Sequence, residues 1–287
     1  MRVVDETDSD LRSMIEADFD GLGSDYAFPQ KLVDWLHFKA RQIPVRPRQV
    51  AMSDQVRVKQ GQYTAIGRIV ENLVSGANME PWLSGSVQRL KEHPKADLLF
   101  NDWKITHFHI GNVFVARNKV RRTRNLLFAY ITDQRAVLLD IQPHGTWTMQ
   151  SMLEILLEVS PSDMEKSELM GVLPPDSALT ADEIYEMRQA GMTAPVVIAG
   201  RVFSPPGLGI STSGHSVRLT NYAADLLNFG SNTTEKISNN QLPVALMRAI
   251  SVNLGQPVRL GLRMDKGQFV LYDKNRNMDL YSMPVLQ

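Results

Sequence analysis

The stretch Leu126-Leu-Phe-Ala-Tyr-Ile-Thr-Asp-Gln-Arg-Ala-Val-Leu-Leu-Asp-Ile141 decides the fold class of this chain. Two runs of apolar, β-branched and aromatic residues flank the polar triplet Thr132-Asp-Gln134, a pattern typical of a β-hairpin with a short loop. The polar and charged residues in the middle exclude a transmembrane helix, which needs about 20 apolar residues in a row. The sequence therefore predicts two neighbouring antiparallel strands here.

One more strand and several helices are predicted around this hairpin. The segment Lys104 to Ile110 alternates between the two faces of a strand and is rich in β-forming residues. Apolar residues recur at helical spacing within residues 29–43, 63–74, 82–93 and 149–159. This order indicates an α+β fold, in which a helical N-terminal region leads into a small antiparallel sheet.

A second α+β module is predicted to follow. The polar, proline-bearing residues 161–178 indicate a linker between a domain of residues 1–160 and a C-terminal module of residues 179–287. In that module, Thr180-Ala-Asp-Glu183 has the form of a capping box that opens a helix. The remaining elements expected there are strands over residues 195–203 and 215–219, helices over residues 222–227 and 242–254, and a hairpin of residues 258–264 and 268–272.

Composition narrows the possible functions. The 287 residues contain 31 Lys and Arg and 31 Asp and Glu, so any attraction to nucleic acid has to be local. No cysteine is present, which excludes disulfide frameworks, thiolate metal sites and cysteine nucleophiles. Residues 1–10 are acidic and lack the apolar core of a secretory signal. We therefore expect a cytoplasmic protein without a membrane partner, whose first residues form a solvated tail.

Three of the six histidines fall on elements that are expected to be neighbours in one sheet. In Thr106-His-Phe-His109, the strand period places His107 and His109 on the same face. His144 lies in Gln142-Pro-His-Gly-Thr-Trp147, a tight turn at the end of the second hairpin strand. The plain alternative is a hydrogen-bonded strand face and a turn histidine that caps the following helix. Together the three imidazoles predict a catalytic site.

A basic segment, Arg117-Asn-Lys-Val-Arg-Arg-Thr-Arg124, lies between the first strand and the hairpin. It holds five cations and no acid. The segment indicates contacts with a phosphate backbone, although cations at a strand edge also deter aggregation. We expect Arg124 to stabilise phosphate charge, and nucleic acid to be bound by the other cations and an aromatic residue: Arg117, Lys119, Arg121, Arg122 and Trp147.

Three functions are compatible with these residues. Two histidines can act as general base and general acid on an RNA 2′-hydroxyl while arginine stabilises the phosphorane-like charge, without a cofactor. A metal-dependent phosphoester hydrolase would need a third ligand beside His107 and His109, such as His144, Asp140 or Asp102. The chief alternative to the ribonuclease is a non-catalytic regulatory protein that binds nucleic acid or protein. A phosphate-binding loop is not predicted, because Gly207-Leu-Gly209 lacks the required lysine.

The segment from Tyr63 to Leu157, about a third of the chain, resembles the metal-independent ribonuclease toxins of the RelE/colicin/EndoU type. Those proteins place helices before a small antiparallel sheet and build the site on the sheet face. The resemblance implies a nuclease, that is, an RNA-cleaving hydrolase with a toxin or antiviral defence role. It implies RNA, more than DNA, as partner, and a protein partner could bind the C-terminal module. The positions that match the catalytic and aromatic roles are His107, His109, Arg124, His144 and Trp147.

Overall fold

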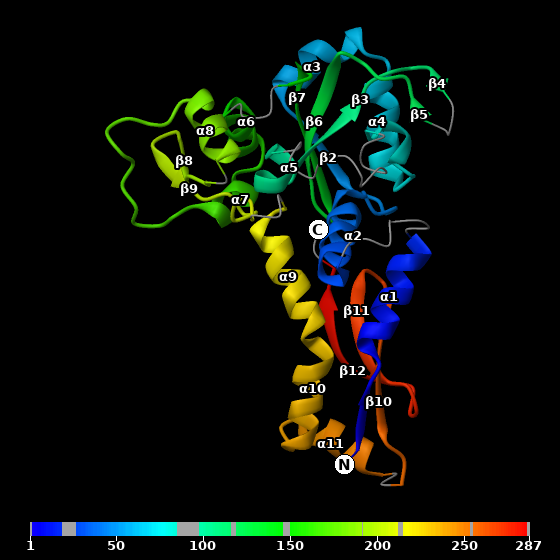
Figure 1. Cartoon of the computed structure of the whole chain (residues 1–287). Coiled ribbons are helices and arrows are strands. Elements are labelled where there is room, and N and C mark those ends of the chain that lie inside the picture. Colours follow the sequence, from blue (N-terminus) through cyan, green and yellow to red (C-terminus); the bar gives the residue numbers. More distant parts are fainter. Residues whose placement is uncertain are drawn as a thin grey trace. The chain divides into compact units, whose positions relative to one another are not determined.

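The computed structural model describes residues 2–18, 27–84, 98–115, 119–145, 150–190, 192–211, 215–252 and 255–285. Helices and mixed sheets make up an α+β fold, which confirms the predicted class (Figure 1). The chain forms two compact units, one of residues 37–218 and one that combines residues 1–36 with residues 219–287. The boundaries between them fall within α2 (Phe28–Arg41) and α9 (Val217–Leu227).

This division differs from the predicted one, because the expected linker 161–178 lies inside the 37–218 unit. The segment begins with α7 (Pro161–Met164) and the 3-10 turn Glu165–Ser167. Its polar residues are used internally: the buried Asp163 carboxylate accepts hydrogen bonds from Ser160 Oγ at 2.7 Å and Lys166 Nζ at 2.8 Å. The polar residues at the start of this segment therefore form hydrogen bonds with a buried carboxylate.

The sheet of the 37–218 unit has the strand order β2-β7-β6-β3. The predicted hairpin is confirmed as β6 (Asn125–Ile131) and β7 (Arg135–Pro143), and β3 (Ile105–His109) pairs antiparallel with β6. The expectation of a purely antiparallel sheet is wrong, because β2 (Gln49–Met52) pairs parallel with β7. Buried Arg48 fixes this edge by donating from Nε to the Thr132 carbonyl at 2.8 Å.

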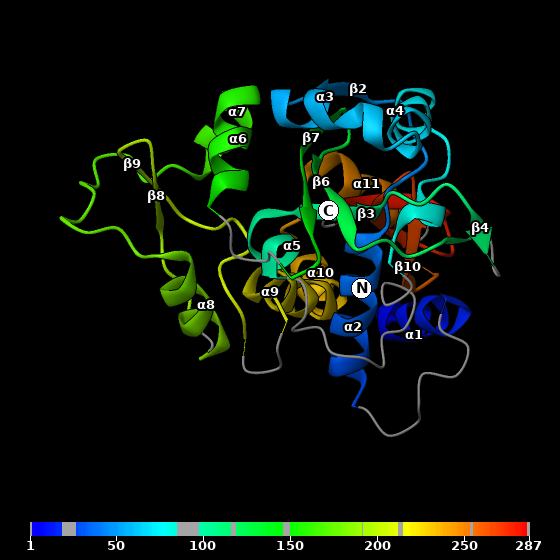
Figure 2. The same cartoon turned by 90° about the horizontal axis from the view of Figure 1, so that it is seen from above.

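Alternation along the strands gives this sheet two apolar faces. One face packs with α4 (Ala65–Ser75), and α3 (Asp54–Lys59) lies against β7 (Figure 2). The other face packs with α6 (Ser151–Val159), next to which lies α7. Helix α4 ends at Gly76, whose φ of 77° and close approach to the backbone at Arg46 leave no room for a Cβ. Because both faces of the sheet are apolar, the histidines of β3 have to share a face with a hydrophobic core.

The other unit contains a sheet of order β1-β10-β11-β12. The predicted hairpin is confirmed as β10 (Val258–Asp265) and β11 (Gln268–Asp273), to which β12 (Met278–Pro284) adds antiparallel. The N-terminal strand β1 (Val3–Asp5) pairs parallel with β10. The helices of this unit that are not yet named are α1 (Thr7–Asp18), α10 (Phe229–Ser238) and α11 (Val244–Ser251).

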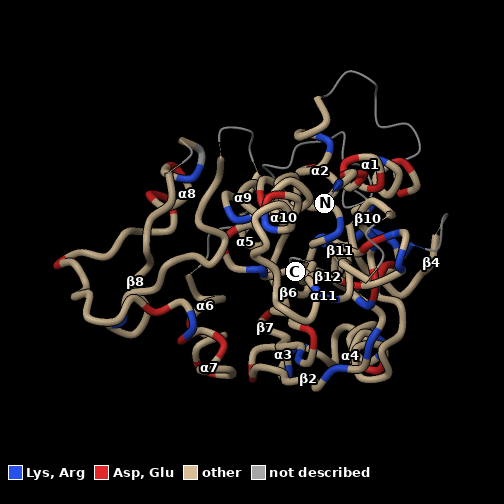
Figure 3. The backbone as a smooth tube through the Cα atoms, turned by 90° about the horizontal axis from the view of Figure 1, so that it is seen from below, with Lys and Arg blue, Asp and Glu red and all other residues tan. Residues whose placement is uncertain are grey.

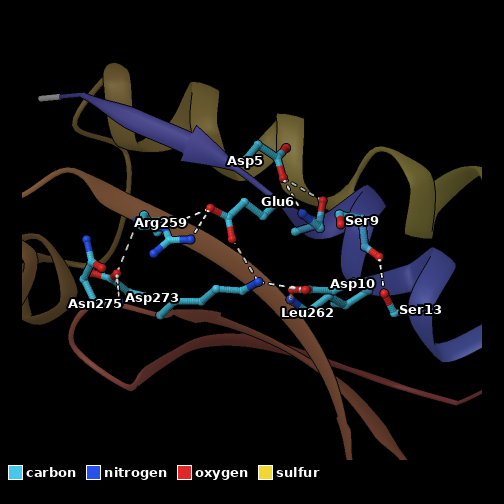
Figure 4. A network of polar contacts seen from close by, with 11 residues as sticks. Asp5, Glu6, Ser9, Asp10, Ser13, Arg259, Leu262, Asp273 and Asn275 are labelled. Atoms are coloured by element: carbon cyan, nitrogen blue, oxygen red, sulfur yellow. Dashed lines mark hydrogen bonds and ion pairs between the residues drawn. The ribbon is translucent and has the colours of Figure 1, made fainter.

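The acidic N-terminus is not the solvated tail that its composition predicts. Glu6 accepts hydrogen bonds from Arg259 Nε at 2.8 Å and Lys274 Nζ at 3.0 Å (Figure 4). Asp10 accepts from the same Lys274 amine at 2.7 Å and from the Leu262 N–H at 2.9 Å. The hydrogen bond from Lys274, followed by that from Arg259, holds the pKa of Glu6 below its ordinary value. These contacts join the first and last parts of the sequence into one unit.

Several smaller predictions have mixed outcomes. The capping box opens α8 (Ala181–Gln189) as expected. The strand over residues 195–203 is instead two short strands, β8 (Val196–Ile198) and β9 (Arg201–Phe203), because Ala199 and Gly200 turn with positive φ. Residues 217–219 of the predicted strand 215–219 begin a helix. The helix predicted over residues 82–93 falls mostly outside the described residues. Elements not predicted include α5 (Leu98–Trp103), β4 (Phe114–Val115) and β5 (Lys119–Val120).

Candidate functional site

The two histidines of β3 lie on the same face of the sheet. His107 is paired in register with Phe128 of β6, and His109 with Leu126. Their imidazole centroids are 6.4 Å apart, with an angle of 86° between the rings. Both side chains are nearly buried, with 7% of His107 and 3% of His109 exposed. The strand thus brings the two rings together within the apolar face that also carries Leu126 and Phe128.

The environment of His109 fixes its protonation state. The Thr123 N–H donates to His109 Nδ1 at 3.3 Å, so the neutral ring carries its proton on Nε2. Burial, and then the electrostatic influence of His107, Arg122 and His144, lowers the pKa of His109 to about 4. In the described part of the chain Nε2 has no hydrogen-bond partner. His109 is therefore a neutral donor at pH 7.

Short hydrogen bonds attach the basic segment to the ends of β3 and β7. The Ile110 N–H donates to Thr123 Oγ1 at 3.2 Å, and this hydroxyl donates to the Asn125 carbonyl at 2.7 Å. The His144 N–H donates to the Arg124 carbonyl at 2.9 Å. The His144 side chain itself is exposed. His109 and His144 therefore lie toward one end of the sheet, and His107 lies further along β3; the two β3 histidines are buried and His144 is exposed.

Three arginines of the basic segment form no ion pair with a carboxylate in the part of the chain that the structure describes. Arg121, Arg122 and Arg124 are exposed, and no ion pair involves them within the described ranges. Lys119 differs, because its amine lies 3.3 Å from Glu80 Oε1 and also donates to the Glu80 carbonyl at 2.8 Å. Its role as a nucleic-acid contact is weakened by this pairing. The predicted site residues Arg117 and Trp147 lie outside the described residues.

Charges of both signs are mixed along the rest of the backbone. In Figure 3, short blue segments of Lys and Arg and short red segments of Asp and Glu are scattered between long stretches of other residues. This mixture agrees with the zero net charge of the sequence. A positive local field next to the histidines therefore depends on the three exposed arginines, not on the molecule as a whole.

Polar residues that sequence reasoning missed also lie on this sheet. Lys59 of α3 donates to Asp140 Oδ1 at 2.7 Å, and Gln142 Nε2 donates to Asp140 Oδ2 at 2.6 Å. Asp140 is paired in register with Phe128, which in turn is paired with His107. Nothing in the local sequence relates Lys59 to a residue 81 positions later. The Asp140 carboxylate is thus occupied by a cation and an amide.

Metal binding by the proposed ligands is not supported where the structure describes them. Asp140 is bonded to Lys59, and Asp102 forms a buried ion pair with Arg188, whose Nε lies 2.5 Å from Asp102 Oδ2. Burial raises the pKa of Asp102, although Arg188 opposes the shift. No group of three histidines or carboxylates that could hold a metal ion occurs in the described ranges.

A separate buried cluster surrounds α5. His37 Nε2 lies 3.1 Å from Asn101 Oδ1, and the His37 and His215 ring centroids are 5.7 Å apart. The neighbouring Gly207 donates its N–H to the Asp102 carbonyl at 3.0 Å, and a Cβ there would lie 1.8 Å from the Asn101 carbonyl oxygen. This glycine serves close packing against α5, which agrees with the absence of a phosphate-binding motif around it.

The arrangement at the sheet end combines an accessible imidazole, a neutral imidazole with a fixed tautomer and three guanidinium groups without carboxylate partners among the described residues. Guanidinium groups bind phosphate in bidentate geometry, and imidazoles can bind or transfer protons. Chemically, the site is therefore suited to a phosphodiester. Comparisons of the chain with protein-family models, with curated proteins and with solved structures find no match.

Proposed function

We propose that the histidine end of the β2-β7-β6-β3 sheet binds a phosphodiester and that the protein is a metal-independent hydrolase of RNA. One observation supports the proposal most: exposed arginines, without carboxylate partners in the described ranges, flank Thr123, the residue whose N–H holds His109. Each such cation near a phosphate contributes through direct attraction and through release of counterions. A cluster that served only to solvate an edge would not need to be attached to two histidines.

The proposed chemistry gives each of the three histidines a different role. His144 is accessible and takes the proton of the ribose 2′-hydroxyl as its oxygen attacks phosphorus. His107 returns a proton to the departing 5′ oxygen, which leaves a 2′,3′-cyclic phosphate and a 5′-hydroxyl. His109, neutral with Nε2–H, donates a hydrogen bond to a phosphoryl oxygen, and Arg124 stabilises the charge that develops there.

The test compares variants on mixed RNA in EDTA. His144→Ala is expected to reduce the rate of cleavage about 10²- to 10⁴-fold, because a general acid or base is removed. Arg122→Ala with Arg124→Ala should weaken RNA binding and lower the log–log salt slope by about one for each phosphate that is no longer bound. Arg57→Ala is the matched control, since Arg57 is exposed but paired with Asp54 at 3.2 Å.

Two results would count against the proposal. If wild-type protein leaves every RNA intact in all conditions, the enzyme assignment is wrong. If EDTA abolishes cleavage, a metal-dependent hydrolase replaces the histidine mechanism. The proposal includes a cytoplasmic location. It also includes a role as a toxin or in antiviral defence, because degradation of RNA inside a cell would have either effect. In this proposal, a protein partner binds the unit formed by residues 1–36 and 219–287.

A second candidate is supported by the burial of the β3 histidines. With 3% of its surface exposed, His109 is poorly accessible, and with a pKa of about 4 it does not transfer protons near pH 7. The same arginines would then bind RNA in a regulatory protein without cleaving it. A mobility shift of RNA without any product, unchanged by His144→Ala but abolished in the double arginine variant, would select this candidate.

A further inference from the structure

A small hairpin next to the arginines carries exposed apolar side chains. Strands β4 and β5 pair antiparallel, with Phe114 opposite Val120 and Val115 opposite Lys119. The Arg121 N–H extends the ladder by donating to the Val113 carbonyl at 2.8 Å. The side chains of β4 and of the residue before it are open to solvent, with 50% of Val113, 44% of Phe114 and 44% of Val115 exposed. Consecutive exposed apolar residues are uncommon unless they bind something.

The ring of Phe114 is held in place at one side. Its centroid lies 6.1 Å from that of Trp82, at an interplanar angle of 77°, in an edge-to-face contact. Trp82 is buried, and so is Val120, the residue opposite Phe114 in the hairpin. The aromatic ring is therefore fixed at an inner edge while nearly half of its surface stays accessible. A fixed, accessible ring gives up little conformational entropy when a planar group stacks on it.

The hairpin is joined directly to the arginines. β5 leads into Arg121 and Arg122, and then into Thr123, which bonds His109. At the base of the hairpin, a Cβ on Gly111 would lie 2.4 Å from the Arg121 carbonyl oxygen, so only glycine allows the two segments to approach this closely. Phe114, Arg121 and Arg122 are exposed and lie on paired, adjoining segments, and together they define a surface that offers an aromatic ring and positive charge.

We propose that this surface binds single-stranded RNA, with one base stacked on Phe114 and the adjoining phosphates on Arg121 and Arg122. The inference rests on the proposed function and specifies its substrate class. Base stacking on aromatic side chains, combined with a positive track, is how proteins hold single strands without reading their sequence. A duplex keeps its bases stacked on one another and cannot offer a base face to the ring. The surface therefore selects unpaired RNA over duplex RNA.

The experiment measures the anisotropy of fluorescein-labelled 2′-O-methyl RNA, which cannot be cleaved through a 2′-hydroxyl. A single strand and the duplex of the same sequence are titrated with wild type, Phe114→Leu, Phe114→Tyr and Val74→Ala. Wild type should bind the single strand at least about tenfold more tightly than the duplex. Phe114→Leu should weaken single-strand binding by about fivefold or more, because removing the aromatic partner of a stacked base weakens binding by about 5- to 150-fold. Phe114→Tyr keeps the aromatic face and should retain affinity.

The outcomes separate this inference from the function on which it rests. Val74, half-exposed on α4, provides a control for truncation of a surface apolar side chain, and its variant should bind as wild type does. Equal affinity for single strand and duplex, or an unchanged Kd in Phe114→Leu, would overturn the stacking surface but not phosphodiester binding. Wild type that binds neither RNA at low salt would overturn the proposed function itself and the stacking surface with it.

Discussion

Titration of His109 gives a direct test of how the site is built. The perturbation is a fall in pH from 7.5 to 3.5, applied to wild type and to His109→Asn. Asparagine retains an oxygen that can accept the Thr123 N–H, but it does not titrate. Any difference in pH dependence between the two proteins therefore reports on the imidazole.

The magnitude follows from the lowered pKa. Well above pH 6.5 the His109 ring is neutral in the folded and unfolded states, so it adds no pH dependence. As the pH falls through 6.5, the unfolded chain binds a proton that the folded state does not accept until the pH is about 4. At about 1.36 kcal/mol per pH unit, the folded state loses about 3 kcal/mol over this window. Below about pH 4 the loss reaches a plateau.

Urea unfolding at each pH measures the effect, and proton NMR of the imidazole locates the pKa. Carboxylates with lowered pKa values, such as Glu6 and Asp163, also reduce stability in acid, but they do so equally in both proteins. Wild type should therefore lose about 3 kcal/mol more than His109→Asn between pH 6.5 and about 4. A His109 resonance that titrates near 6.5, or parallel stability curves, would refute the burial and tautomer assigned to this ring.

Two further predictions concern packing in the same unit. Arg188→Ala should lower the free energy of unfolding by about 3–5 kcal/mol, because it leaves the Asp102 carboxylate buried without its partner. Adding Asp102→Asn to this variant should restore part of the loss. If urea unfolding shows that the losses of the two single variants simply add, the two residues do not form a direct pair. Gly207→Ala should lower the midpoint of thermal unfolding, because the added Cβ would lie 1.8 Å from a backbone oxygen of α5. Gly61→Ala is the control and should leave the midpoint unchanged, because nothing lies within 4 Å of a Cβ at that position. Similar midpoints for both variants would argue against the close approach of Gly207 to α5.

Elements with a strong local pattern could be predicted from the sequence. Two hairpins, at residues 126–141 and 258–272, combine apolar runs with short polar loops, and both are present with strands and turn where the sequence predicts them. The capping box at Thr180 is formed as well, because its two reciprocal hydrogen bonds need only residues three positions apart. Such features depend on neighbours in the chain, so a single sequence contains all the information that they require.

Pairings between distant segments could not be predicted. β1 pairs with β10 and β2 with β7, segments far apart in the chain, and β1 and β2 are only three and four residues long. Strands this short carry almost no periodic signal. The role of the acidic N-terminus could not be predicted either, because Lys274, the partner of Glu6, lies 268 positions away in the sequence. The charge composition of a segment does not show which distant side chains form ion pairs with it.

For the site, periodicity predicted a shared face but not its environment. The spacing of His107 and His109 requires one face of a strand, and the structure places both there. Whether that face meets water or a core depends on which helices cover it, and here it also carries the apolar residues of the α6 side. Exposure, and with it the pKa, is a property of the tertiary packing.

The difference in exposure between the histidines has a consequence for how substrate would be used. A neutral, buried His109 cannot change its charge near pH 7, so its contribution is a fixed hydrogen-bond donor and not proton transfer. In the proposed mechanism, proton abstraction is assigned to His144, which is exposed and whose N–H donates to the Arg124 carbonyl. The hydrogen bond joins the backbones of Arg124 and His144, and the proposed mechanism requires their side chains to act on the same phosphate.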